Sequence, residues 1–105
     1  MKAFKKVLIE AIDAGLFMLG EYGRDLIYSR LKDSYGLIKD DIPDHIEIFI
    51  KFIKEIFGHG AVAIEKEIIS HLSKKLEIKP NEKKSYSLIE YLNEARKIFD
   101  EKFKS

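Results

Sequence analysis

Histidine and acidic side chains are the residues in this 105-residue sequence best suited to chemistry, and their spacing decides whether they can hold a metal ion. Glu67 and His71 are four residues apart, so a helix would place both on the same face. A metal site needs at least three protein ligands, and neither His45 nor His59 completes a His-Glu-x-x-His pattern with them. Cysteine is absent, which excludes thiolate ligands, thiol nucleophiles and disulfides. We therefore expect no metal site and no bound cofactor.

Asp40, Asp41 and Asp44 bring three carboxylates together, and clustered carboxylates can serve acid–base catalysis. They lie, however, at the expected start of a helix, where negative charge is stabilised by the helix dipole. Asp44 is a good N-cap residue, and Glu47 three residues later completes a capping-box-like pattern. We interpret these carboxylates as capping residues and predict no catalytic residue.

The sequence Gly58-His59-Gly60-Ala61 places glycines where the backbone N–H groups at the start of a helix could receive an anion. A dinucleotide-binding fingerprint needs a preceding strand and a third glycine, and a phosphate-binding loop needs a following lysine and serine or threonine. None of these is present. The favoured interpretation is a tight corner, in which Gly58 ends one helix and Gly60 precedes the next.

Basic and acidic residues nearly cancel, at 19 against 18, so no net field selects nucleic acid as a partner. One segment has a local excess of lysines that could contact phosphates: Lys74, Lys75, Lys79, Lys83 and Lys84. No aromatic residue interleaves them, glutamine is absent and arginine occurs three times, so base-reading side chains are scarce. A solvated loop is the favoured interpretation, and a nucleic-acid-binding regulator is the alternative function.

Helical periodicity accounts for every long apolar series, so we predict an all-α fold, a single domain spanning residues 1–105 and a compact bundle of about five helices. The expected helices cover residues 2–19, 21–35, 46–57, 61–76 and 88–103. Turns are expected at Gly20, Gly36, Gly58 and Gly60, and Ser87 with Glu90 forms a capping box.

The first two helices differ in the faces that they bury. Ala11, Ala14 and Gly15 give the first helix a surface without bulk, which lets another backbone approach closely. The second helix is expected to bury four residues: Leu26, Ile27, Leu31 and Tyr35.

The third helix is expected to be central and nearly fully buried, because eight of its twelve residues from 46 to 57 are large and apolar. Beside its main apolar stripe runs a second one, formed by Ile48, Phe52 and Ile56. This second stripe must be covered either by the chain itself or by a partner, and the sequence favours neither. If a partner covers it, Phe52 is the expected aromatic anchor of the interface.

The longest run without a polar side chain is Ala14–Gly20, which is too short to span a membrane, so a cytoplasmic protein is expected. Lysine and isoleucine are abundant and side-chain amides are scarce, a bias typical of heat-adapted proteins.

The glycine and apolar positions resemble a small archaeal helical domain of unknown biochemical activity, the Nitrosopumilus output domain, which occurs alone or attached to signalling receiver modules. The matching positions are Gly15-Leu16-x-x-Leu19-Gly20-Glu21, Ile27-Tyr28, Tyr35-Gly36-x-Ile38, Ile42-Pro43, Phe49, Ile56-Phe57-Gly58-x-Gly60-Ala61 and Ile64-Glu65. Gly23 departs from the pattern. The resemblance implies an output or interaction module of an archaeal cell and no enzyme.

We therefore expect a non-catalytic helical module that acts by self-association, most simply as a homodimer, or by docking to a protein partner. A sensor that binds a small molecule in an apolar cleft between helices is neither supported nor excluded by the sequence.

Overall fold

The computed structural model describes residues 4–80 and 87–102, and every regular element within them is a helix. In chain order the elements are α1 (Phe4–Leu16), η1 (Phe17–Leu19), α2 (Gly20–Tyr35), η2 (Lys39–His45), α3 (Ile46–Phe57), η3 (Gly58–Gly60), α4 (Ala61–Leu76) and α5 (Leu88–Lys102), where η marks a 3₁₀ helix. Helical residues continue without a break through 4–35, 39–76 and 88–102, so the described residues form three continuous stretches and not five separate helices. The predicted all-α class is confirmed. Among the described helices, none combines the length and the apolar character needed to cross a membrane.

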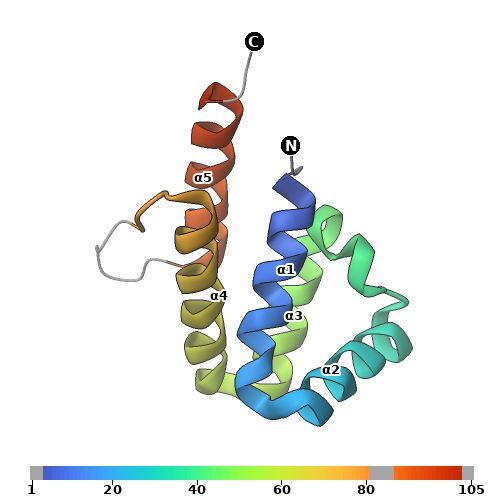
Figure 1. Cartoon of the computed structure of the whole chain (residues 1–105). Coiled ribbons are helices and arrows are strands. Elements are labelled where there is room, and N and C mark those ends of the chain that lie inside the picture. The colour runs from blue at the N-terminus through green and yellow to red at the C-terminus, as the bar shows by residue number, and fades with distance from the viewer. Residues whose placement is uncertain (1–3, 81–86, 103–105) are drawn as a thin grey trace.

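The core is built around α1 and α4, which run antiparallel and lie side by side (Figure 1). Each of them buries seven residues, whereas α3 buries four. Gly15 permits the close approach, because a Cβ added there would lie 2.5 Å from Cγ1 of Ile68 and 3.2 Å from its backbone nitrogen. The small residues of α1 therefore act as the sequence predicts, by letting a neighbouring backbone come near.

The prediction that the third helix forms a nearly fully buried centre is wrong. α3 exposes four charged residues and also Ile56, whose side chain is 46% exposed. The buried residues of α3 are Phe49, Ile50, Phe52 and Ile53. Because α1 and α4 pack directly against each other, α3 lies on the flank of this pair, behind α1 in Figure 1. Its four charged residues form the face that remains in solvent.

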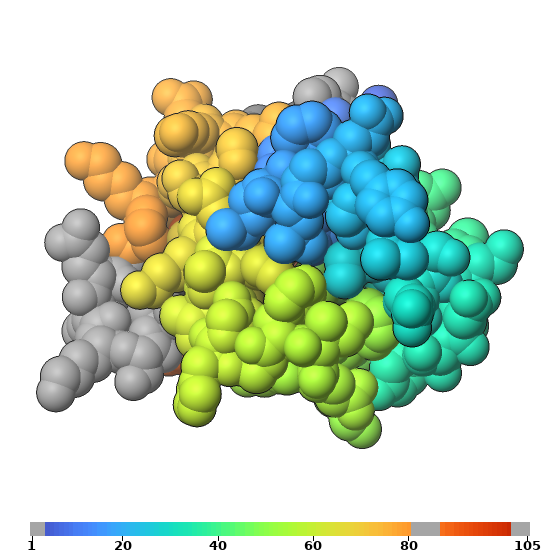
Figure 2. Space-filling view, turned by 90° about the horizontal axis from the view of Figure 1, so that it is seen from below, coloured from blue at the N-terminus to red at the C-terminus, as the bar shows by residue number. Residues whose placement is uncertain are grey.

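Glycines set the sharp bends of the chain. Gly20, with φ 82°, is the first residue of α2 and directly follows η1, and Gly58, with φ 54°, directly follows α3. Both bends lie at the same end of the molecule, and Figure 2, which views that end, shows them beside each other in blue and yellow-green. Gly36 ends α2 in the left-handed region, with φ 65°, where a side chain would be strained. Gly60 has the ordinary helical φ of −65° and directly precedes α4.

Asp44 does not cap α3, contrary to the prediction. The chain is already helical from Lys39, because η2 passes through Pro43 and ends at His45, which takes the N-cap position. Asp44 instead pairs with Lys5 of α1, with 2.7 Å between Nζ and Oδ1. The hydrogen bond from Lys5 lowers the pKa of Asp44. The side chain that was expected to start a helix thus ties η2 to α1.

The start of α5 is capped by its own residues and by α4. Ser87 Oγ accepts a hydrogen bond from the N–H of Glu90 at 3.2 Å, and the Glu90 carboxylate accepts one from the N–H of Ser87 at 3.0 Å. This is the reciprocal capping box that the sequence predicts. Glu65 of α4, which is 8% exposed, accepts the N–H of Leu88 at 3.2 Å. The buried Glu65 carboxylate therefore fixes the N-terminal end of α5 against α4.

Candidate docking surface

The second apolar stripe of α3 is largely covered within the chain. Phe52 is 4% exposed and Ile48 is half-buried, whereas Ile56 remains exposed. The ring of Phe52 packs edge-on against Tyr35 of α2, with 5.9 Å between ring centroids and 85° between ring planes. Tyr35 also donates a short hydrogen bond to Glu55 of α3, and this bond raises the pKa of Tyr35. Phe52 thus belongs to the core and is not available as the anchor of an interface, because α2 folds back over α3.

The position of α2 is fixed by a polar cluster around Asp13 of α1. The Asp13 carboxylate accepts a hydrogen bond from the Tyr28 hydroxyl at 2.9 Å and lies 3.1 Å from Nζ of Lys39 and 3.4 Å from Nη1 of Arg24. Burial acts to raise the pKa of Asp13, but the hydrogen bonds from Lys39 and Tyr28 and the charges of Lys39 and Arg24 outweigh it and lower the pKa. Burial, together with the bond to Asp13, raises the pKa of Tyr28. The ionised carboxylate and the protonated hydroxyl therefore hold α1, α2 and η2 together.

The outward side of α2 carries an exposed apolar surface. Tyr22 is 81% exposed and Leu26, one turn later, is 41% exposed. Directly before them in η1, Phe17 is 53% exposed and Met18 is 51% exposed. These four residues are called the α2 stripe below. They begin at the η1 bend, on the end of the molecule seen in Figure 2.

This surface differs from the sequence prediction, which gives α2 a single buried face. Leu26 and Tyr35 were predicted to be buried and are 41% and 38% exposed, whereas Ile27 and Leu31 are 5% and 0% exposed. At about 100° per residue, the pair Tyr22 and Leu26 points roughly 140° away from the pair Ile27 and Leu31. The sequence does contain the pattern of two apolar faces on this helix, because Tyr22 and Leu26 form one pair with a spacing of four residues and Ile27 and Leu31 form another.

Arg24 connects the α2 stripe to the polar cluster beneath it. Its guanidinium carbon lies 5.4 Å from the centroid of the Phe17 ring, which is cation–π geometry. Its Nε lies 3.1 Å from Oδ1 of Asp25, and its Nη1 faces Asp13. One side chain therefore holds the Phe17 ring in place and neutralises the carboxylate next to it.

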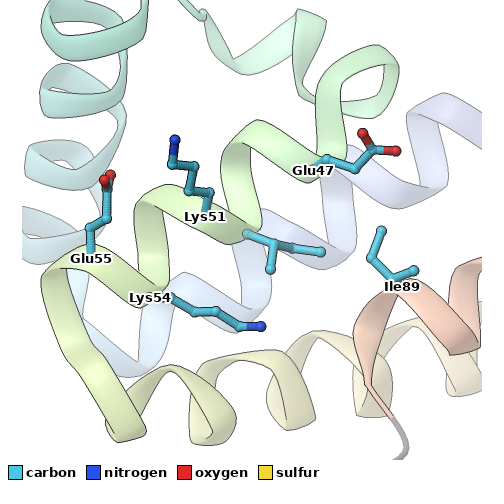
Figure 3. Close-up of a pocket in the computed structure, with 6 residues that line it drawn as sticks. Glu47, Lys51, Lys54, Glu55 and Ile89 are labelled. Atoms are coloured by element: carbon cyan, nitrogen blue, oxygen red, sulfur yellow. The ribbon is translucent and has the colours of Figure 1, made fainter.

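A shallow groove of about 480 Å³ separates α3 from α5. Figure 3 shows Ile89, at the start of α5, facing α3, while Lys51 and Glu55 point away from it. The groove is lined by Glu47, Ile50, Lys51, Lys54, Glu55 and Ile89. Two acids and two amines share its rim, so its charge does not select a particular ligand.

The predicted lysine cluster is seen in part. Lys74 and Lys79 are exposed near the end of α4, and Lys75 lies 3.7 Å from Oε1 of Glu10 on α1. Lys83 and Lys84 lie outside the described residues.

Glu67 and His71 form a pair on α4, with 3.6 Å between Oε2 and Nε2. Within residues 4–80 and 87–102, no three histidine, aspartate or glutamate side chains lie close enough to hold a metal ion.

Comparison with protein-family models, with curated proteins and with solved structures finds no match to this chain.

Proposed function

We propose that this chain is a non-catalytic helical module that works by docking its α2 stripe onto another protein surface. The observation that carries the proposal is the exposure of Tyr22, at 81%, beside three further exposed apolar residues. Taken at about 200 Å² for each fully exposed residue, these fractions give the four residues a total exposed area of about 450 Å², hydroxyl and backbone atoms included, which is within the size range of the largest, often functional patch on a monomer. A signalling-output role, which the sequence resemblance implies, needs a surface of this kind.

The chain holds the α2 stripe rigidly from behind. Ile27 and Leu31 bury the opposite side of α2, and the Asp13 cluster fixes its first half through Arg24 and Tyr28. A surface that is ordered before binding loses less conformational entropy when a partner binds. Tyr22 suits the role of anchor, because tyrosine combines a large apolar ring with a hydroxyl and is enriched at interface hot spots.

The polar side chains that gather beside α2 are engaged with one another. Asp13 is shared by Tyr28, Arg24 and Lys39, and its lowered pKa keeps it ionised. A general acid or base works best with a pKa near the working pH, and this carboxylate is shifted in the opposite direction. The cluster therefore supports a positioning role for these residues.

A photoreactive amino acid placed at position 22 tests the function in the cells that produce the chain. The expected result is a covalent adduct heavier than the chain after illumination. The matched control places the same amino acid at Lys97, an exposed position on α5. If adducts form at neither position, or equally at both, docking through the α2 stripe is ruled out.

A further inference from the structure

We propose that α5 is a detachable helix, which leaves the rest of the chain as one unit while residues 4–76 stay folded. Residues 4–76 are called the body below. The proposal does not depend on docking through the α2 stripe. It rests on where α5 contacts the body, on the two cavities beside it and on the buried carboxylate at its start.

α5 is buried along its first half only. Its buried residues all lie between positions 88 and 95: Leu88, Tyr91, Leu92 and Ala95. Residues 96–101 contain no buried side chain, and Ile98 is 43% exposed. Figure 1 shows this second half of α5 projecting beyond the ends of α1 and α4. Few apolar contacts therefore have to break for the helix to leave, which is the property of elements that open at low free energy.

The contacts that hold α5 lie towards α4 and the start of α1. α5 packs mainly against α4, and the Tyr91 hydroxyl donates a hydrogen bond at 2.7 Å to the carbonyl of Ile78, which follows α4 closely. The Phe4 ring of α1 lies 5.4 Å from the Phe99 ring, centroid to centroid. The guanidinium carbon of Arg96 lies 4.9 Å from the centroid of the same Phe4 ring. These contacts are on α5 at one end and on the body at the other, so all of them break together when α5 leaves.

Towards α3, α5 borders open space. The groove of about 480 Å³ separates Ile89 from α3. A second cavity, of about 360 Å³, lies between α5 and the junction of η2 with α3, with His45 on one wall and Asn93 and Arg96 on the other. A side chain that faces a cavity lacks contact partners on that side. α5 therefore loses less packing on leaving than a helix that is enclosed on all sides.

The departure of α5 returns a buried charge to water. Glu65 of α4 is 8% exposed and is the one charged side chain buried in the described part of the chain. Its carboxylate accepts the N–H of Leu88 at 3.2 Å. A carboxylate this buried has lost most of its hydration, which costs free energy. When α5 leaves, water replaces the N–H and hydrates the carboxylate, so the group that positions the docked helix also lowers the cost of releasing it.

The body keeps a core of its own when α5 leaves. α1 and α4 pack directly against each other, as closely as Gly15 and Ile68 allow, and α3 continues into α4 through η3 without a non-helical residue. The opened chain thus combines a folded body with a free helix whose apolar side is exposed. A partner that binds the freed helix, or the face that it uncovers, shifts the chain towards the opened state.

Native-state hydrogen exchange of the full chain tests the detachment, because it distinguishes amides that open with α5 alone from amides that open only with the whole chain. The reporters are the amides of Leu92 and Ala95 for α5 and those of Ile68 and Leu72 for the body. Relative to their intrinsic rates, the α5 reporters are expected to exchange at least about tenfold faster than the body reporters. Their exchange should also rise less steeply with urea, because the release of one helix exposes less surface than unfolding of the chain.

Two variants separate the two kinds of opening. Asp13→Asn removes contacts within the body that stay intact when α5 leaves. It should speed the body reporters about five- to thirtyfold and leave the α5 reporters unchanged. Tyr91→Phe removes the hydrogen bond to Ile78, which breaks in both kinds of opening, so it should speed all the reporters by one common factor.

Three results would overturn the detachment. The first is wild-type α5 reporters that exchange as slowly as the body reporters and with the same urea dependence, a comparison that needs no variant. The second is an Asp13→Asn chain in which both sets of reporters speed up equally. The third is protection that falls steadily along α5 from Leu92 towards its end, because a helix that leaves as one unit gives its amides one common opening free energy.

Discussion

Replacing Gly15 by alanine tests the contact between α1 and α4, on which the rest of the fold is built. On an unobstructed helix this change would stabilise the chain by about 1 kcal/mol, because alanine is the better helix former. Here the new Cβ would lie 2.5 Å from Cγ1 of Ile68 and 3.3 Å from its Cα, so backbone as well as side chain must move. Overpacking of this kind costs about 1–3 kcal/mol. The steric term outweighs the propensity gain, and we expect a net loss of about 1 kcal/mol in the free energy of unfolding.

Urea unfolding followed by circular dichroism measures the change, and a fall in Tm of about 4–8 °C should accompany it. Gly60→Ala is the matched control, because its Cβ would meet nothing nearer than Phe57 Cβ at 3.6 Å and its stability should change by less than about 0.5 kcal/mol. In an Ile68→Ala background, which removes Cγ1, the alanine at position 15 should cost much less than in the wild type. Equal costs in both backgrounds, or a Gly15→Ala chain as stable as the wild type, would refute the close approach of α1 to α4.

Three further changes test the elements that position α2 and α5. Asp13→Asn should cost about 1–2 kcal/mol at pH 7 after allowance for partial exposure. The folded-state pKa of Asp13 is lowered, so its contribution is complete above the unfolded pKa of about 3.9 and is lost as the pH falls through the lower folded pKa. Urea titrations should therefore show wild type and Asp13→Asn converging in strong acid, and a constant gap would be contrary evidence. Ser87→Ala should cost about 1 kcal/mol and speed amide hydrogen exchange in the first turn of α5, and unchanged exchange would mean that the cap contributes nothing. Phe52→Glu should abolish cooperative thermal unfolding, because it places a charged side chain in a buried position. A Phe52→Glu variant that still unfolds cooperatively would show that position 52 is not part of the core.

The helices themselves could be predicted from the sequence, because helix formation follows from local periodicity and from glycine and capping patterns. Ile27 and Leu31 on α2 and the Ser87 capping box were identified in this way. Gly15 was also identified, as part of a small-residue surface, although its neighbour Ile68 was not. Local patterns thus give the elements and some of their contact faces without giving the partner of each face.

The arrangement of the helices could not be predicted, because it depends on which of several apolar faces meet. The abundance of apolar residues in α3 suggested a central helix, but the close contact of α1 with α4 placed α3 on the flank. Asp44 had the sequence pattern of a cap, and the preceding 3₁₀ turn η2 removed the helix start that it would have capped. Glu65 was not predicted as a cap either, because the N–H that it accepts lies 23 residues further along the chain.

The location of the proposed docking surface could not be predicted from the sequence either, because it also depends on how the helices are arranged. Phe52, the residue expected at an interface, is buried against Tyr35 of α2. The surface proposed for docking lies on the other side of α2, at Tyr22 and Leu26. Composition and periodicity correctly indicated more apolar surface than one simple amphipathic face per helix. They did not indicate which helix presents the surplus to solvent.

Photocrosslinking from position 22, in the cells that produce the chain, tests most directly whether the α2 stripe docks onto another protein. An adduct heavier than the 12.2 kDa of one chain is expected from position 22, which is 81% exposed, and not from the exposed control position Lys97. Adducts at neither position, or equally at both, would contradict the account.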